Sequence, residues 1–483
     1  MARKPNILFL MTDQMQGRVL DPKHPCLTPH LDRLADRGMR FSHAYTPNAV
    51  CSPARASLMT GLLPHSHGVL EVTHVVDDDQ CCLRTDKPHW AQRLVQLGYH
   101  TGYFGKWHVE RTDEPEPFGW QVNGVTSGSL YRQHQNQLRG KQRPEPKHAL
   151  AHYIDHPPGY RRNLLYAVTH QPPHTRGMGV TTSLAEGFLQ EVLFEETPWC
   201  CFVSVSEPHD PFVCEQKTFD LYDVEALELP PNLHDDLTDR PGLYRKASAA
   251  FAQMTEQQHR EAAACYYASI TEIDQTFGRL IELVGQAGAL DNTIIIFTSD
   301  HGEFLGAHGL YCKNVSGFEE AYNIPMVMTG PGIASGVVSD ARVGLHDLCP
   351  TILDLVGAEP LSEPDSRSFA PLLSDPALAV SYRKGYAEYH GGRYRLTQRL
   401  YWEGDWKLIF NGFDYDELYN LSCDPFEMHN LATDPAHQSR LQDMLAAIWR
   451  RVRDTGDHAL WNSHYFGLRI APFGPGIAGD HRW

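Results

Sequence analysis

The sequence predicts an α/β protein with a large mixed, mostly parallel sheet flanked by helices, and a smaller C-terminal antiparallel-sheet subdomain. Short apolar runs alternate with helical patterns over about the first 375 residues, which is the pattern of strand–helix–strand units. Aromatic and β-branched runs joined by glycine-containing turns follow, and these are typical of antiparallel strands. The composition, 42% hydrophobic and 21% charged over 483 residues, excludes global disorder.

The N-terminal elements follow from apolar runs and from the residues that interrupt them. Residues 6–11 are almost continuously apolar and predict the first strand. Thr28 and Pro29 suit the N-cap and first position of a helix that ends at Gly38, and residues 90–97 repeat this pattern. The further elements predicted here are strands at 100–104, 200–205 and 293–298 and a long helix at about 256–284.

The rest of the chain divides into an insertion and a C-terminal subdomain. Residues from about 131 to 174 are rich in His, Gln, Arg and Pro and have little apolar periodicity, which predicts a long loop-like insertion over one face. The change of pattern near residue 375 predicts one domain at 1–375 and a second at 376–483. The elements predicted in the second are strands at 382–389, 394–402 and 406–410 and a helix near 441–453.

Charge and hydropathy exclude several functional classes. Forty-two basic against 59 acidic residues give a net charge of −17 without any basic tract, so we expect no nucleic-acid partner and no membrane surface. No apolar run approaches the roughly 20 residues of a membrane-spanning helix. The N-terminal strand becomes polar at Thr12 and Asp13 without a small-residue cleavage site, so we expect a cytoplasmic protein. The 11 cysteines show no C-x-x-C pair and no repeated spacing, which argues against a disulfide framework.

Ionisable residues follow four of the predicted strands. Ligands of open α/β sheets bind outside the carboxyl ends of the strands. A single Asp at a strand end is an ordinary turn residue, but four such ends together predict a functional site at this edge of the sheet. The residues are Asp13 with Gln14, Lys106 with His108, Glu207 with His209 and Asp210, and Asp300 with His301.

A fifth segment, residues 51–55 (CSPAR), predicts a capped helix. Ser52 suits the N-cap, Pro53 the first helical position, and Gly61 the end of the helix. Cys51 then lies just before a helix N-terminus, where backbone N–H groups favour an anion that Arg55 also reaches. Taken alone, this segment fits a buried thiol beside an ordinary capped helix equally well.

Together these segments resemble the type I sulfatase family of the alkaline phosphatase superfamily. Residues 51–55 with the following Thr60-Gly61 fit its signature, C-x-[PA]-[SA]-R and then T-G. The resemblance covers nearly the whole chain in the family's order, and implies an alkaline phosphatase-like fold and hydrolysis of a sulfate monoester. The other matching segments are 5–13, 105–108, 299–303, 308–313, 347–351 and 417–431.

The resemblance also implies a mechanism. In this family the cysteine that matches Cys51 is oxidised to formylglycine by a formylglycine-generating enzyme, and the hydrated aldehyde is the nucleophile, which carries the sulfate during the reaction. The implied metal ligands are Asp13, Gln14, Cys51, Asp300 and His301. The implied catalytic residues are Arg55, which fixes the formylglycine, Lys106 and Lys313, which hold the sulfate, His108, the base that releases the sulfate, and His209, the acid for the leaving alcohol.

Two residues depart from the commonest pattern of the family. Many sulfatases have a second Asp at the position of Gln14 and an Asn at that of His301. We expect Ca²⁺ as the metal, with Mn²⁺ as the alternative because an imidazole ligand favours transition ions. A similar Gln and His pair occurs in relatives that hydrolyse phosphonate monoesters and phosphodiesters, which is the alternative function. Lys106 and His108, in contrast, match the sulfate-ester members.

The identity of the alcohol stays open, since an aryl, carbohydrate or alkyl sulfate each suits the implied core. His67 is predicted as a further substrate contact, against the simpler interpretation of a loop histidine in a chain with 27 of them. The acidic run 77–79 is interpreted as a solvated loop in preference to a cation site. A non-catalytic relative with an unconverted Cys51 is the remaining alternative, and no residue favours it.

Overall fold

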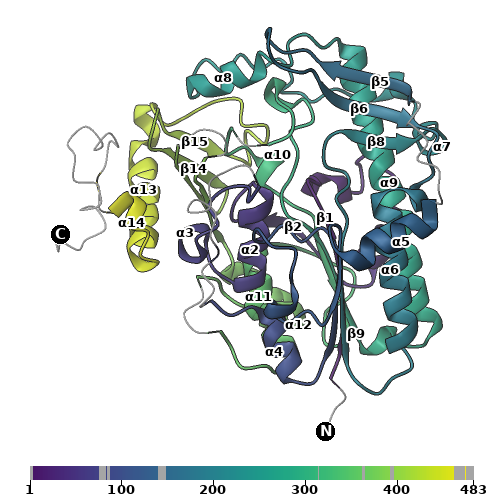
Figure 1. Ribbon diagram of the computed structural model, residues 1–483. Coiled ribbons are helices and arrows are strands. Elements are labelled where there is room, and N and C mark those ends of the chain that lie inside the picture. Colours follow the sequence, from purple (N-terminus) through teal and green to yellow (C-terminus); the bar gives the residue numbers. More distant parts are fainter. Residues whose placement is uncertain are drawn as a thin grey trace.

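The computed structural model describes residues 4–74, 83, 87–139, 148–313, 315–361, 365–391, 396–461 and 474. A large eight-stranded sheet forms its centre (Figure 1). All strand pairs in it are parallel except those that the four-residue β10 makes with its two neighbours. This confirms the predicted mixed, mostly parallel sheet. In spatial order the strands are β11 (Val337–Gly344), β2 (Met39–Tyr45), β10 (Met326–Thr329), β9 (Thr293–Ser299), β1 (Asn6–Thr12), β7 (Trp199–Ser204), β3 (His100–Gly105) and β4 (Val122–Val125).

Helices cover both faces of this sheet, which explains why its central strands are apolar without alternation. On β1, Leu8 and Leu10 pack into one core, while Ile7, Phe9 and Met11 pack into the other. The first core is covered by α1 (Pro29–Asp36), α6 (Gly177–Val192) and α9 (Glu256–Gln286). The second is covered by α2 (Cys51–Thr60), α4 (Trp90–Gln96), α11 (Leu348–Val356) and α12 (Ala370–Ser374), on the opposite side in Figure 1.

The predicted strands of the large sheet and the predicted helices beside them agree with the structure within one or two residues. The strands β1, β3, β7 and β9 and the helices α1, α4 and α9 all lie where the apolar patterns place them. Thr28 precedes α1 as predicted, but its hydroxyl donates to the Asp32 carboxylate (3.0 Å) and does not cap a backbone N–H. The sequence patterns gave no prediction for four strands of this sheet, β2, β4, β10 and β11.

The insertion at 131–174 contains regular structure, so the loop-like prediction is wrong. It holds the end of α5 (Ser129–Arg139) and the strands β5 (His148–Ile154) and β6 (Asn163–Thr169). These strands form a three-stranded sheet with β8 (Phe212–Glu215). The residues of β5 are mostly half-exposed. The strand therefore carries histidines at positions where a central strand has apolar residues, and it lacks a clear apolar periodicity.

The C-terminal part forms an antiparallel sheet, as predicted, but with a fourth strand that was not predicted, and with a second strand that begins four residues later than predicted. One face packs on α13 (Gln438–Asp454), and the other shares a core with the first part of the chain, where Trp402 stacks near Tyr45. Because this core is shared, a boundary at residue 375 remains a prediction. The strands are β12 (Lys384–Tyr389), β13 (Gln398–Glu403), β14 (Trp406–Asn411) and β15 (Glu417–Asn420).

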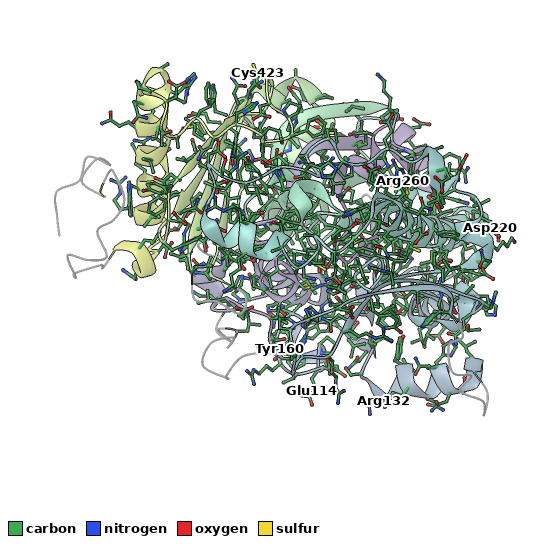
Figure 2. All side chains as sticks on the ribbon, turned by 90° about the horizontal axis from the view of Figure 1, so that it is seen from above. Glu114, Arg132, Tyr160, Asp220, Arg260 and Cys423 are labelled. Atoms are coloured by element: carbon green, nitrogen blue, oxygen red, sulfur yellow. The ribbon has the colours of Figure 1, made fainter. Side chains whose placement is uncertain are left out.

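Two general properties concern the described part of the chain. No helix in it has the length and apolar character needed to cross a bilayer. Its nine cysteines are all free thiols. Most of these are buried, while Cys423 is exposed and lies at the periphery of the molecule (Figure 2).

Candidate active site

The four strand ends predicted to carry polar residues meet at one place. β9, β1, β7 and β3 are neighbours in the sheet and run parallel, so the residues that follow them share one edge. Cys51 Sγ, at the start of α2, lies 3.3 Å from His301 Nε2 and 3.8 Å from Asp13 Oδ1. The structure therefore brings the predicted nucleophile and two predicted metal ligands into direct contact.

The helix that carries Cys51 begins two residues earlier than predicted. Cys51 is its first residue and Val50 its N-cap. Ser52 is not the cap, because its Oγ accepts from the Thr73 backbone N–H (3.3 Å). Gly61 ends the helix with a φ of 71°, as predicted. Cys51 thus lies at the positive end of the helix dipole and is only 3% exposed.

Two lysine ammonium groups and two imidazole rings surround the Cys51 sulfur. Burial alone would raise the pKa of the thiol, but Lys106, Lys313, His301 and His108 together bring it well below its usual value. Such an electropositive, buried position suits an anionic substrate. It also suits a nucleophile that has to develop negative charge.

Arg55 connects the residues beneath the cysteine. Its Nε donates to Asp300 Oδ2 (2.8 Å), its Nη1 to Ser204 Oγ (2.7 Å), and its Nη2 lies 3.4 Å from Asp13 Oδ2. The two carboxylates raise the pKa of Arg55 despite its burial. Arg55 is therefore a fixed cation on the floor of the site.

Four side chains offer a place for a divalent metal ion. Asp13, Cys51, Asp300 and His301 each present one ligand atom, and these atoms lie within 4.8 Å of one another. His301 donates from Nδ1 to the Gly302 carbonyl (2.9 Å), which leaves Nε2 free to bind a metal. Two carboxylates and one imidazole suit Ca²⁺ or Mn²⁺. The residues present fit the metal that the family implies.

Gln14, the fifth predicted ligand, has other partners. Its Oε1 accepts from Lys313 Nζ (2.6 Å), and its Nε2 donates to Glu303 Oε2 (2.5 Å) and to Asp210 Oδ1 (3.1 Å). The amide oxygen and both amide hydrogens contact these three residues, so the Gln14 side chain positions Lys313 in this structure. Its backbone N–H donates to Asp300 Oδ1 (3.1 Å), and this contact keeps the residue at the rim of the ligand cluster.

His209 lies between Asp210 and Lys313. Its Nδ1 donates to the Asp210 carbonyl (2.7 Å), and its Nε2 lies 2.5 Å from Lys313 Nζ. Burial and Lys313 lower the pKa of His209, but Asp13, Cys51 and Asp210 outweigh them and raise it to about 9. Glu207 does not contact the ring, since its Oε1 accepts from the Met178 backbone N–H (3.2 Å).

Lys106 and His108 approach the site from the end of β3. The Lys106 ammonium forms an ion pair with Asp13, and its backbone N–H donates to the Ser204 carbonyl (2.8 Å). His108 has a positive φ of 54° and its Nε2 lies 2.9 Å from His74 Nδ1. Burial lowers the pKa of His108, which favours the neutral ring that a proton acceptor requires.

A pocket of about 980 Å³ opens above this cluster. The predicted residues that line it are Cys51, Lys106, His108, His209 and Lys313. The structure does not bring His67 there, contrary to the predicted substrate contact. His67 is fully buried against Ser57 Oγ (2.9 Å), and burial lowers its pKa to about 3, so it is a neutral core histidine.

Sequence reasoning assigned no role to several residues that hold the site together. Glu303 accepts from Gln14 and from the Cys312 backbone N–H (2.6 Å), and so supports Lys313 from below. Burial raises the pKa of Glu303 to about 8. Two signals in the sequence could have found Glu303: it lies two residues after His301, and it ends the matching segment 299–303. The acidic run 77–79 lies outside the described residues.

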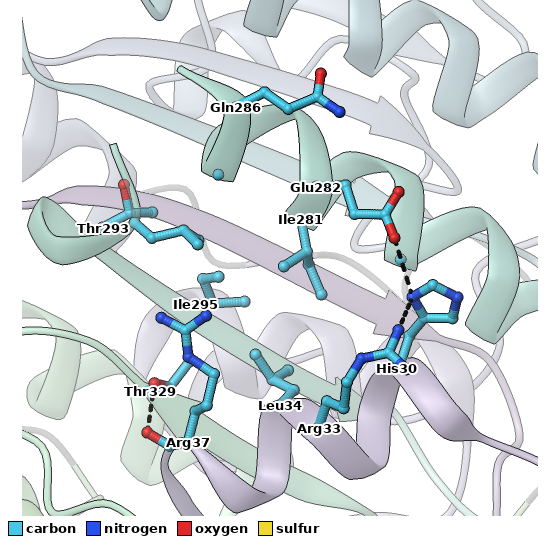
Figure 3. A pocket seen from close by; sticks show the side chains of 13 residues that line it. His30, Arg33, Leu34, Arg37, Ile281, Glu282, Gln286, Thr293, Ile295 and Thr329 are labelled. Carbon is cyan, nitrogen blue, oxygen red and sulfur yellow. Dashed lines mark hydrogen bonds and ion pairs between the residues drawn. The ribbon is translucent and has the colours of Figure 1, made fainter. Parts of the chain in front are cut away.

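A second pocket, of about 430 Å³, lies between α1 and α9 (Figure 3). Leu34, Ile281 and Ile295 form its apolar floor, and Arg33 donates to His30 Nδ1 (2.8 Å) at its rim. It shares no residue with the pocket above Cys51.

Comparison with known proteins identifies the class. The family model "Sulfatase" matches residues 5–358, and the model "N-sulphoglucosamine sulphohydrolase, C-terminal" matches residues 306–454. The chain therefore belongs to the sulfatase family and is a sulfuric ester hydrolase.

Several individual proteins are similar over nearly their whole length. A choline-sulfatase from Rhizobium meliloti (strain 1021) is 30% identical, with 92% of this chain and 87% of the relative covered. An N-acetylglucosamine-6-O-sulfatase from Bacteroides thetaiotaomicron is 28% identical, with 94% and 88% covered. The solved structure of a phosphonate monoester hydrolase from Silicibacter pomeroyi superimposes with a TM-score of 0.79 at 23% identity, covering 95% of this chain and 97% of that one. This last likeness confirms the fold.

Proposed function

We propose that the protein hydrolyses a sulfate monoester to an alcohol and inorganic sulfate, using formylglycine made from Cys51 and one divalent metal ion. The observation that carries this proposal is the position of Cys51. It lies at a helix N-terminus, in contact with Asp13 and His301, at the bottom of a pocket lined by Lys106 and Lys313. Ca²⁺ is the proposed metal, with Mn²⁺ as the alternative.

The residues of the chain divide the work of binding the sulfate. Asp13, Asp300 and His301 would hold the metal, which with the formylglycine hydrate supplies a hydroxyl that is activated near neutral pH. Lys106 and Lys313 bind the sulfate oxygens and meet the negative charge that grows as the S–O bond breaks. Arg55 holds the carboxylates of Asp13 and Asp300 in place. By resemblance to the family, it also fixes the formylglycine at position 51.

Two histidines transfer protons. The raised pKa of His209 favours the protonated ring, which suits the acid that protonates the leaving oxygen. A sulfate oxygen that binds the Lys313 ammonium also releases Nε2 of His209 from its contact with that ammonium. His108, which lines the same pocket and has a lowered pKa, accepts a proton.

Phosphonate monoesters and phosphodiesters are the alternative substrates. The pair Gln14 and His301 favours them by resemblance, whereas Lys106 and His108, which both line the pocket, favour sulfate esters. The structure gives Gln14 a contact with Lys313, which is equally useful to either anion. We therefore place sulfate first.

Mass spectrometry tests the proposed nucleophile. In protein from the native host, the tryptic peptide 41–55 should carry formylglycine at position 51, and the Cys51→Ser variant should release no sulfate from 4-nitrophenyl sulfate. Active protein in which position 51 is only cysteine would contradict the proposal. Maturation by a formylglycine-generating enzyme and a cytoplasmic location remain predictions.

A further inference from the structure

The leaving alcohol has to lie beside His209, and three polar residues line the pocket close to that position. They are Arg176 at the start of α6, Glu207 after β7, and Ser269 on α9. Glu207 is bonded to the Met178 N–H, two residues after Arg176, and the Arg176 guanidinium forms an ion pair with Glu272, one turn after Ser269. The three residues therefore belong to one wall of the pocket.

Each of these residues has a polar atom that is shielded from solvent. Arg176 Nε, Glu207 Oε2 and Ser269 Oγ make no hydrogen bond to any residue in the described part of the chain. Arg176 is 8% exposed and Ser269 1%. An unsatisfied buried polar group costs about 1–3 kcal/mol, and three in one wall of a pocket indicate that another molecule supplies their partners.

The chemistry of these atoms defines the partner. Arg176 Nε offers a hydrogen, Glu207 Oε2 accepts one, and Ser269 Oγ does both. The charge of Arg176 is already compensated by the ion pair with Glu272, so these three residues do not require an anionic ligand. Neighbouring hydroxyl groups, which donate and accept, match this set.

Two other classes of alcohol match it poorly. A quaternary ammonium group has neither a donor nor an acceptor, and its usual binding site is a cage of aromatic rings. Of the described residues that line the pocket, Trp107 is the one aromatic residue apart from the histidines. It is only 2% exposed. An aryl group likewise finds little exposed ring surface to stack on.

We propose that Arg176, Glu207 and Ser269 form a subsite for the hydroxyl groups of the leaving alcohol, so that the substrate is a carbohydrate sulfate. This inference rests on the proposed sulfatase function and adds the substrate class. All three residues line the same pocket as His209, the group that protonates the leaving oxygen in the proposed function.

The test compares three sulfate esters: N-acetylglucosamine 6-sulfate, choline O-sulfate and 4-nitrophenyl sulfate. With protein whose position 51 is converted, kcat/KM should be higher for the sugar sulfate than for choline O-sulfate. Ser269→Ala should lower the ratio of kcat/KM for the sugar sulfate to that for 4-nitrophenyl sulfate by about tenfold. Ser206→Ala is the matched control, because this serine lines the same pocket but is exposed, and its ratio should equal that of the wild type.

A binding measurement separates this inference from the proposed function. Titration calorimetry of N-acetylglucosamine 6-sulfate with unconverted protein needs no turnover, and Ser269→Ala should weaken binding by a similar factor. An unchanged ratio and unchanged binding in Ser269→Ala would mean that only water satisfies the three atoms, and would overturn the inference. Converted protein that hydrolyses none of the three esters would contradict the sulfatase proposal, while the calorimetry would still decide the subsite.

Discussion

Single residues in this site act through shared partners. Arg55 contacts Asp13, Asp300 and Ser204 at once, and Gln14 contacts Lys313, Glu303 and Asp210. A buried charge is stabilised only when its partners are in place, so the loss of one member leaves the others uncompensated. The site is thus a connected network of charges on a few fixed backbone positions.

His209 provides the sharpest prediction at this scale. His209→Ala should reduce kcat about 100-fold or more for esters of poor leaving alcohols, and far less for 4-nitrophenyl sulfate, because a nitrophenolate leaves without a proton. The measurement is a plot of log kcat against the pKa of the leaving alcohol, which should be steeper in the variant. Equal losses on all esters would remove His209 as the general acid.

Among the secondary-structure elements, the close approach of β3 to β7 places Lys106. Gly105, the last residue of β3, has a φ of 97°, and a Cβ there would lie 2.0 Å from the Ser204 carbonyl oxygen. The next residue, Lys106, donates to that same carbonyl. The position of the Lys106 ammonium, the proposed sulfate ligand, therefore depends on the absence of a side chain at residue 105.

Gly105→Ala should lower the free energy of unfolding by about 3 kcal/mol or more and kcat/KM by about 100-fold, because it separates the strands and displaces Lys106. The matched control is Gly98→Ala. Gly98 also has a positive φ, 86°, but a Cβ there meets nothing within 4 Å. This control should lose only about 1–2 kcal/mol for the left-handed backbone, with unchanged kinetics. Denaturant unfolding and initial rates measure both, and similar results for the two variants would contradict the steric explanation.

A charged histidine links α3 (Pro64–His67) to the C-terminal sheet. His65 donates from Nδ1 to Glu388 Oε1 (2.6 Å) and from Nε2 to the Thr455 carbonyl (3.1 Å). Burial lowers the pKa of His65, but Glu388 outweighs it and raises the value from 6.5 to about 9. The ion pair thus contributes stability fully below pH 6.5, where the unfolded chain is also protonated, and loses it between pH 6.5 and 9.

The wild type should exceed His65→Gln in free energy of unfolding by about 3 kcal/mol more at pH 6 than at pH 9. Urea unfolding of both proteins at the two pH values measures it. The glutamine does not titrate, so the comparison cancels groups common to both proteins, such as the buried neutral His67. A difference that stays constant with pH would show that His65 is uncharged in the folded protein.

For the molecule as a whole, the sequence predicted the parts that are buried on both sides. β1, β3, β7 and β9 were predictable because both of their faces are covered, which makes them continuous apolar runs. β2 was missed because Ser42 and His43 interrupt its pattern where the strand is half-buried. The antiparallel insertion of β10 between β2 and β9 depends on pairing between distant segments, which periodicity does not encode.

In the candidate site, too, some features were predictable from the local sequence and others depend on distant residues. The residue types at the strand ends were predictable, because the sheet edge where they gather follows from strand direction. His67 was misassigned because a histidine that Ser57 satisfies in the core has the same local sequence as a loop histidine. The orientation of the Gln14 amide depends on Lys313, which lies 299 positions further along the chain.

Metal binding should stabilise the whole molecule, since the ligands lie on α2 and directly after the strands β1 and β9. Ca²⁺ or Mn²⁺ at about 100 times its Kd should raise the free energy of unfolding by about 2.7 kcal/mol relative to chelator-treated protein. His301→Ala removes a metal ligand and leaves both carboxylate ligands in place. In this variant, the increase in the free energy of unfolding on metal addition should be smaller. An equal gain in the variant would place the ion elsewhere.

The most direct test of the central claim is a pair of rates measured on one preparation. Protein with formylglycine confirmed at position 51 is given 4-nitrophenyl sulfate and a matched 4-nitrophenyl phosphonate monoester, with Cys51→Ala as the blank. The account predicts a clear preference for the sulfate ester, in a rate that is absent from the variant. A preference for the phosphorus ester would contradict it, and would show that Gln14 and His301 determine the substrate more than Lys106 and His108 do.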